Sequence, residues 1–190
     1  MDETTESDFI KYGSPYMQMH RVFIGLEPTW GEIYAVEFTE NSPVSYIKKL
    51  DVVRDKLPID ALTQTSHANL VNLREVFVAE TSLFFVYEKW GISLKEMQHL
   101  SPVFRFGEVE IATLCREVLE GLKYIHKTLG ISHGSLSEGN IYITDNGGVK
   151  IANIGQCMLR GVRLEGMRRD ISDVCNLARA LLGPSDAPAT

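Results

Sequence analysis

The pattern that most constrains the fold is a long amphipathic stretch followed by two short apolar runs around a turn. Apolar residues recur at three- and four-residue spacing through 107–128, which predicts a helix with one buried face: Ile111, Leu114, Cys115, Val118, Leu122 and Ile125. Downstream, 140–144 and 148–152 flank Asp145-Asn146-Gly147, a sequence typical of a β-hairpin turn. We therefore expect a helix that leads through a loop into a hairpin.

The rest of the chain divides into a strand-rich first half and a helical second half. We expect strands and helices over the following ranges: a strand at 31–38 after a turn at 27–31, a helix at 44–57 that ends before Pro58, an antiparallel strand pair at 70–78 and 82–88, and a helix at 170–182 that ends at Gly183-Pro184. Strands followed by helices predict an α+β chain with two lobes.

Composition excludes several function classes. The 190 residues are 44% hydrophobic, enough for a sizeable core, and the formal net charge is -6. That charge argues against binding to nucleic acid or to an anionic membrane. The three cysteines are widely spaced and odd in number, which favours reduced thiols in a cytoplasmic protein. Residues 1–10, which are acidic, and 184–190 are expected to be flexible tails.

Five segments follow one another in a characteristic order: GEIYAVEF, SHANLVNLREVF, LFFVYEKWGISL, LCREVLEGLKYIH and DISDVCNLARALLG. They resemble, in turn, the V-A-I-K strand, the stretch after the αC helix, the strand and hinge, the αE helix and the start of the αF helix of a protein kinase. The resemblance is closest to the sterile-twenty and p21-activated group of serine/threonine kinases. It implies a kinase-like N-lobe at 11–88 and a truncated, helical C-lobe at 89–183.

The residues between the last two segments, ISHGSLSEGNIYITDNGGVKIANIG at 131–155, resemble a kinase catalytic loop and metal-binding turn. The resemblance places His133 and Asn140 where a kinase has its own His and Asn. It places Ser135 at the catalytic Asp, Ser137 at the loop Lys, and Asn153 at the magnesium-binding Asp. Glu138 is the loop's one acid, and we weigh it as a displaced base against a solvated side chain. The scaffold is kept, whereas the charged groups are lost.

The phosphate-binding positions also differ from the kinase pattern. An ungapped count places Glu37 at the V-A-I-K lysine and Pro58 at the αC glutamate. The same count puts Pro15, Met17 and His20 at the three glycines of the glycine-rich loop. Lys48 and Lys49 are the alternative cations, and the helical expectation for 44–57 makes them surface residues.

The resemblance also implies a vestigial nucleotide pocket and a retained apolar skeleton. The expected pocket residues are Val22, Ala35, Tyr87, Glu88, Trp90 and Tyr142. Tyr142 replaces an ordinary Leu and either fills the adenine space or points elsewhere. Leu62, Leu73, His133 and Ile154 match the spine residues, and Asp170 matches their αF anchor.

Together these features predict a catalytically inactive kinase-like domain, a pseudokinase, that acts by binding proteins. The alternatives are a divergent serine/threonine kinase with weak ATP-dependent activity, and a gene remnant without a selected role. We expect no cofactor and no metal, with ATP and magnesium relevant only to the active alternative; Asn140 and Asn153 are vestigial ligands. A partner protein, or a second copy, is expected to cover the helix at 170–182. The arginines at 160–169 form a solvated linker or bind an acidic partner.

Overall fold

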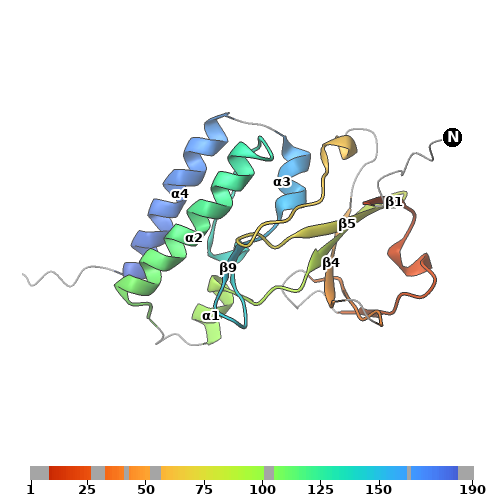
Figure 1. The fold of residues 1–190 in the computed structure, drawn as a ribbon, viewed down its shortest axis with the longest axis horizontal. Helices are drawn as coiled ribbons and strands as arrows, with labels where there is room; N and C mark the ends of the chain where they lie inside the picture. Colours follow the sequence, from red (N-terminus) through yellow and green to blue (C-terminus); the bar gives the residue numbers. More distant parts are fainter. Residues whose placement is uncertain are drawn as a thin grey trace, which may run out of the picture. The chain divides into compact units, whose positions relative to one another are not determined.

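The computed structural model describes residues 9–26, 33–40, 43–51, 57–100, 105–161 and 164–183. The chain divides into two compact units (Figure 1). The first unit comprises Met1–Ser66 and Val71–Lys89, and the second comprises His67–Leu70 and Trp90–Thr190. The first is rich in strands and the second in helices, so the predicted α+β class is confirmed. Residues 67–70 join the second unit, although the sequence placed them in the first.

The first unit is built on one six-stranded sheet with the order β1-β5-β6-β4-β3-β2. Its strands are β1 (Ile10–Tyr12), β2 (Phe23–Gly25), β3 (Ala35–Glu37), β4 (Ser45–Asp51), β5 (Leu73–Val78) and β6 (Ser82–Glu88). All neighbours are antiparallel except β1 and β5, which are parallel. Two 3-10 turns, η1 (Pro15–Met17) and η3 (Ile59–Ala61), lie between strands.

The expected antiparallel pair is confirmed as β5 and β6. The expected tail at 1–10 is wrong at its end, because Ile10 begins β1 and the Phe9 carbonyl accepts a hydrogen bond from the Val76 amide. Residues 1–8 and 184–190 lie outside the described part of the chain, as do the turn at 27–31 and the start of the expected strand at 31–38.

The helix expected at 44–57 is wrong, because 45–51 form strand β4. This strand lies between β3 and β6 and pairs with both. Ile47 and Leu50 have a spacing that a helix also permits, so the sequence pattern did not discriminate. Pairing on both edges and burial of Ile47 in the core decide in favour of the strand. Residues 52–56 lie outside the described part.

The core of the first unit is an aromatic and β-branched cluster on one face of this sheet. Its buried members come from four neighbouring strands: Ala35, Ile47, Phe77, Phe84 and Val86, with Phe23 and Ala79 packed against them. Each strand supplies alternate residues to this face, as the two-residue period of a strand requires. The cluster packs β3 and β4 together with β5 and β6.

An ion-pair cluster crosses the sheet of the first unit. Arg21 donates from Nε and Nη2 to the two carboxylate oxygens of Glu37, both at 2.6 Å, and from Nη1 to Glu75 Oε2 at 2.7 Å. Thr39 Oγ1 donates to Glu37 as well. The Arg21 and Glu37 side chains are 15% and 7% exposed. Burial alone raises the pKa of Glu37, but the hydrogen bonds from Arg21 and Thr39 outweigh it and lower the pKa.

We predict that Arg21→Gln lowers the free energy of unfolding by about 2–3 kcal/mol, because it leaves two carboxylates beside each other without their shared cation. Urea unfolding at pH 7 measures this loss. Since the Glu37 pKa is lowered on folding, its contribution is present above the ordinary value of 4.5 and is lost as the pH falls through the lower folded value. The variant should lose this acid dependence.

Lys49→Gln is the matched control, because the Lys49 partner, Asp51, is exposed, with 77% of its side chain accessible. It should leave the urea midpoint unchanged. If Arg21→Gln were equally silent, the cluster would not contribute to stability.

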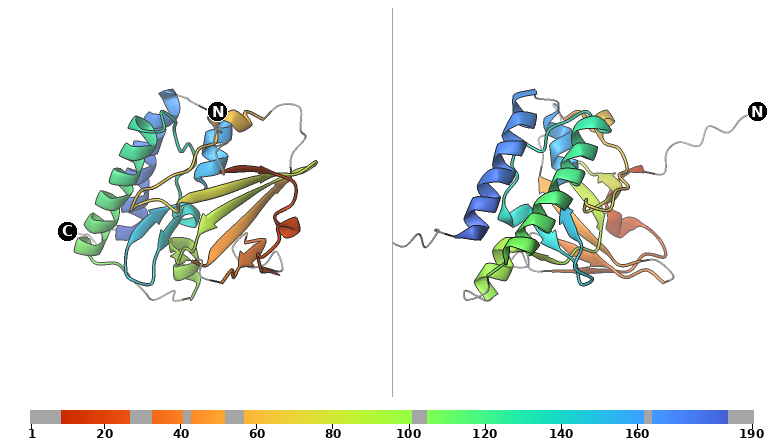
Figure 2. Two further views of the ribbon diagram at one scale, coloured as in Figure 1. Left: turned by 45° about the vertical axis from the view of Figure 1, so that its right-hand side comes forward. Right: turned by 60° about the vertical axis from the view of Figure 1, so that its left-hand side comes forward.

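The second unit combines helices with a small sheet. Its three strands are ordered β7-β8-β9 and comprise β7 (Ile92–Ser93), β8 (Ile141–Ile143) and β9 (Val149–Ile151). The helices are α1 (Leu94–Leu100), α2 (Glu108–Lys127), α3 (Ile154–Arg160) and α4 (Leu164–Leu182), with the 3-10 turn η4 at Glu138–Asn140. Helices α2 and α4 run side by side, as both views of Figure 2 show.

The helix predicted at 107–128 is confirmed as α2, and the predicted hairpin is confirmed as β8 and β9. All the expected apolar positions of α2 are buried except Cys115, which is half-buried. The last helix, α4, begins at Leu164 rather than at 170, so it takes up most of the linker expected at 160–169, and Arg160 of that stretch ends α3. Among the described residues, no helix has both the length and the apolar character that crossing a membrane requires.

Candidate functional site

The loop between α2 and β8 carries most of the residues that the sequence singled out. It leaves α2 with the Ile131 amide bonded to the Ile125 carbonyl, and it ends in η4. Ile131, Ser132 and His133 are buried, whereas Ser135 is exposed. The backbone path is therefore held within the second unit, while the position of the catalytic Asp in the kinase pattern faces solvent.

Asp170 of α4 holds this loop in place. Its Oδ1 accepts the Gly134 amide at 2.7 Å, and its Oδ2 accepts the His133 amide at 2.8 Å and contacts His126 Nε2 at 2.8 Å. The carboxylate is completely buried. Gly134 has φ 72, a conformation that glycine adopts without strain. At this point the successive amides of His133 and Gly134 both donate to the Asp170 carboxylate. The expected anchor position thus makes the contacts of an anchor.

Ser135 lies at the tip of the loop, with its hydroxyl beside a cation. Arg160 Nη2, at the end of α3, donates to Ser135 Oγ at 3.3 Å, and Asn140 Nδ2 donates to the Ser135 carbonyl at 2.6 Å. Asn140 Oδ1 accepts the Ser137 amide at 2.9 Å. The Asn140 amide therefore closes the loop by bonding its backbone on both sides.

His133 is packed into the second unit rather than presented to a substrate. Its Nε2 lies 3.0 Å from the Ala152 carbonyl, and its ring is 1% exposed. Within the described residues, Nδ1 has no hydrogen-bond partner. Burial lowers the pKa of His133, so the ring is neutral at physiological pH. Its contact with Ala152 ties the loop to the residue before Asn153.

Asn153 begins α3 with a left-handed backbone, φ 64 and ψ 22. Helix α3 then packs on the loop, where Cys157 Sγ lies 3.3 Å from the His133 carbonyl and 3.2 Å from Arg160 Nη2. Burial raises the pKa of Cys157 to about 11, and the thiol stays protonated. The turn that carries a metal-binding Asp in the kinase pattern is here the start of a helix.

Magnesium is implied by the kinase resemblance, and the two candidate ligands fit it poorly. Mg²⁺ is normally held through carboxylates together with substrate phosphates. Asn140 and Asn153 are both neutral amides, and the Asn140 amide already bonds the loop backbone.

The expected nucleotide-pocket residues lie in both units, and each unit orders its own. In the first, Ala35 and Tyr87 are almost fully buried in the sheet, Val22 is 57% exposed, and Glu88 Oε1 accepts Asn72 Nδ2 at 3.2 Å. In the second, Trp90 and Tyr142 are both 5% exposed. Their rings meet edge to face, with centroids 5.7 Å apart. The Tyr142 ring is thus packed against Trp90.

Residues 18–162 match the protein kinase domain. The chain belongs to the protein kinase family. It is 30% identical over 151 residues to cyclin-dependent kinase 10 of Rattus norvegicus, covering 74% of this chain and 42% of that protein. It is 35% identical over 101 residues to the serine/threonine-protein kinase Tao of Drosophila melanogaster, covering 52% of this chain and 9% of that protein.

The serine/threonine-protein kinase dst2 of Dictyostelium discoideum is 31% identical over 137 residues, covering 68% of this chain and 12% of that protein. The chain spans less than half the length of each of these relatives. The assignment to the sterile-twenty and p21-activated group stays a prediction.

The strand order corrects the expectation that Glu37 occupies the position of the phosphate-binding lysine of a protein kinase. The lysine lies on the third strand, after the two strands that flank the glycine-rich loop. Here β2 and β3 form the first antiparallel pair and β4 is third, so the lysine position moves from Glu37 to β4. The sequence S-Y-I-K at 45–48 then matches V-A-I-K at its last two positions, and Lys48 is 4% exposed.

The glycine-rich loop moves with it. Pro15 and Met17 belong to η1 and His20 has φ 67, and all precede the β2–β3 pair. The kinase loop joins two strands, so the corresponding connection here starts at Gly25 and ends before Ala35. Residues 27–32 of that connection lie outside the described part. The ungapped count failed because it started from the wrong strand.

The αC position of a kinase follows the lysine strand. Within 57–72, the described residues between β4 and β5 hold only the 3-10 turn η3, and Pro58 stands directly before it. Pro58 is therefore not on a helix. Sequence reasoning considered Lys48 only as an alternative surface cation, although the I-K pair could have placed it on the lysine strand. It did not foresee the contact of Arg160 with Ser135, which depends on α3 and has no signal in a motif.

We predict that Asp170→Asn destabilises the second unit by about 3 kcal/mol, because three donors lose a buried anion that all of them share. Hydrogen exchange of the His133 and Gly134 amides should accelerate, and thermal unfolding should shift to lower temperature.

Asp173→Asn on the same helix is the control. Asp173 is half-buried, forms no hydrogen bond within the described part of the chain, and acts on His133 through its charge alone. It should leave both exchange rates unchanged. Equal protection of the two amides in Asp170→Asn would contradict the anchoring role.

Proposed function

We propose that this member of the protein kinase family is catalytically inactive and acts in the cytoplasm by binding other proteins. The observation that carries the proposal is the environment of Ser135. The residue at the base position is a neutral hydroxyl, and Arg160 donates to its oxygen. A kinase base must accept the proton of the substrate hydroxyl as the phosphoryl group is transferred.

Neither neighbouring group supplies the missing base. Glu138, the acid of this loop, accepts a hydrogen bond from Gln98 Nε2 at 3.1 Å, which directs its carboxylate toward α1. Ser137 replaces the loop lysine, so the cation that would neutralise a transferred phosphoryl group is absent from that position. Phosphoryl transfer depends on these groups acting together, and their losses are not made good by the retained backbone.

The candidate metal ligands support the same conclusion. Two amides at Asn140 and Asn153 offer neutral oxygens where an active kinase has at least one carboxylate. We therefore propose that neither magnesium nor ATP serves as a working cofactor.

Lys48 favours the second candidate, a divergent serine/threonine kinase. Its position on β4 restores the cation that the ungapped count had replaced by Glu37. A lysine by itself can hold phosphates but cannot accept a proton from a substrate. Nucleotide binding without transfer is accordingly the strongest form of this alternative.

We predict that the purified chain transfers no phosphate from radiolabelled ATP, with magnesium or manganese, to itself or to a general protein substrate. Its melting temperature should also stay unchanged with millimolar Mg²⁺·ATP. Binding would be visible as a rise, because a ligand at one hundred times its Kd stabilises a fold by about 2.7 kcal/mol.

Two variants separate the candidates. Transfer that disappears in Asn140→Ala would establish the active kinase and overturn the proposal. A melting shift that disappears in Lys48→Met, without transfer, would establish a nucleotide-binding domain that is not an enzyme, and would contradict only the expected absence of ATP.

Helix α4 offers the surface for protein binding. One face packs within the second unit through Val174, Leu177 and Leu181, which are at most 7% exposed. The adjoining stripe is apolar and largely uncovered: Ile171 (45% exposed), Cys175 and Leu182 (57% exposed) are exposed, and Ala178 is half-buried. At about 100° per residue these four positions fall within about 60° of arc. Such a stripe is typical of an interface.

We predict that the purified chain self-associates through this stripe and that Ile171→Glu shifts it toward monomer, because a charge would be buried there without a partner. Light scattering across a concentration series measures the apparent mass.

Asn176→Glu, an exposed position on another face of α4, should leave the association unchanged. A wild-type mass that stays monomeric at all concentrations would contradict self-association through α4.

A further inference from the structure

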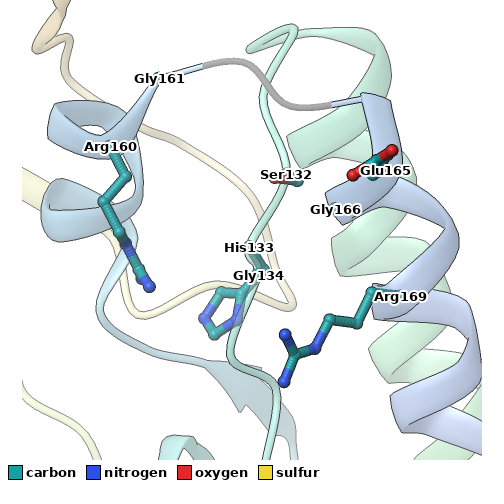
Figure 3. A pocket seen from close by; sticks show the side chains of 8 residues that line it. All are labelled: Ser132, His133, Gly134, Arg160, Gly161, Glu165, Gly166 and Arg169. Atoms are coloured by element: carbon teal, nitrogen blue, oxygen red, sulfur yellow. The ribbon is translucent and has the colours of Figure 1, made fainter.

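A cavity of about 240 Å³ lies beside the loop between α2 and β8 in the second unit (Figure 3). It is lined by the loop, the end of α3 and the first turns of α4: Ser132, His133, Gly134, Arg160, Gly161, Glu165, Gly166 and Arg169. The protein-binding role proposed above does not use it. Three of the lining residues are glycines, and a Cβ at Gly134 would meet only Ser132 Oγ, at 3.9 Å. Backbone atoms therefore form much of its wall, and no side chain fills the space at Gly134.

Two guanidinium groups enter this cavity from opposite sides. Arg160 reaches in from α3, and Arg169 reaches in from α4 toward Gly134 (Figure 3). Arg160 uses Nη2 on Ser135 and Cys157 and Nε on the Gln156 carbonyl. The Arg169 side chain is exposed and forms no hydrogen bond or ion pair with the residues that the structure describes. An extended cation facing a cavity is available to an anion that enters it.

The other charges around the cavity do not neutralise the two arginines. Glu165 is exposed on the first turn of α4 and is the one acid among the lining residues. Asp170 lies behind the loop, and its carboxylate is engaged by two amides and His126. His133 is neutral because burial lowers its pKa. The lining thus carries two cations and one anion.

We propose that this cavity binds a phosphorylated side chain of a partner protein. A phosphate group carries three acceptor oxygens and about -1.5 to -2 charges at pH 7, so it can meet guanidinium groups on two sides at once. Arginine matches such an anion through paired N–H donors. A carboxylate has two oxygens in one plane and a single charge, and it satisfies opposed guanidiniums less well.

Size and charge select among phosphate-bearing ligands. Cavities that enclose a drug-sized ligand typically measure about 300–1,000 Å³, so a whole nucleotide exceeds this cavity, whereas a phosphate on a side chain fits. The formal net charge of -6 disfavours a membrane surface rich in anionic headgroups. The inference extends the proposed function by giving the chemistry of one partner. It holds or fails by binding alone, without any transfer assay.

The test uses the full chain and an oriented library of short peptides with a fixed central phosphothreonine or phosphoserine, immobilised in parallel with the unphosphorylated library. Peptides selected from the library are then titrated by fluorescence polarisation, and backbone amide shifts of Gly134, Gly161 and Gly166 are followed by NMR. We expect binding of phosphorylated peptides only, with shifts at these three glycines.

The variants are chosen to leave the fold intact. Arg169→Gln should weaken binding by about tenfold or more, the loss of one charge-assisted contact. Arg168→Gln removes the same charge from the neighbouring residue, which does not line the cavity, and should bind like the wild type. Glu165→Gln should strengthen binding, since it removes the one acid of the lining. Equal melting temperatures confirm that each variant is folded.

Three results would overturn the proposal. One is equal capture of phosphorylated and unphosphorylated libraries. A second is an equal loss of binding in Arg168→Gln and Arg169→Gln, which would indicate a diffuse charge effect. The third is that inorganic phosphate, sulfate or phosphoinositide vesicles shift the same glycines while no phosphopeptide does, which would make the cavity a site for an adventitious ion only or for a lipid.

Discussion

One buried carboxylate organises the second unit. Asp170 accepts the amides of His133 and Gly134 and contacts His126, so it joins α4, the catalytic loop and α2 at a single point. A fully buried charge is costly unless hydrogen bonds compensate it, and here three donors converge on two oxygens. The path of the loop, the start of α3 and the wall of the arginine-lined cavity all depend on this arrangement.

The anchor acts through backbone amides, and this has a consequence for the rest of the loop. Side chains at the neighbouring positions can change without loosening it. Ser135 and Ser137 replace charged residues of the kinase pattern, while the loop still closes through Asn140 and its contacts to the Ser135 carbonyl and the Ser137 amide. The path of this loop therefore does not depend on the side chains at positions 135 and 137.

Much of this arrangement follows from the sequence, and the failures have physical causes. The period of Ile111, Leu114, Val118, Leu122 and Ile125 specifies α2, and Asn146-Gly147 specifies the hairpin, since both signals are local. The 45–51 segment was misassigned because Ile47 and Leu50 fit a helix equally well, and only pairing with β3 and β6 decides. With 45–51 assigned to a helix, the preceding strand was taken as the lysine strand, and Glu37 was placed at the lysine position. Helix α3 and the contact of Arg160 with Ser135 depend on packing against the loop, which no short motif encodes.

The reactivity of the Cys157 thiol can report local opening of the second unit. Its thiol is fully buried, and with a pKa of about 11 almost none of it is thiolate at neutral pH. Cys175, on the exposed stripe of α4, is open to alkylating reagents in the folded monomer. The rate at which Cys157 follows Cys175 in reacting therefore reports how often α3 separates from the loop. The native chain carries its own probe of local opening, without an introduced label.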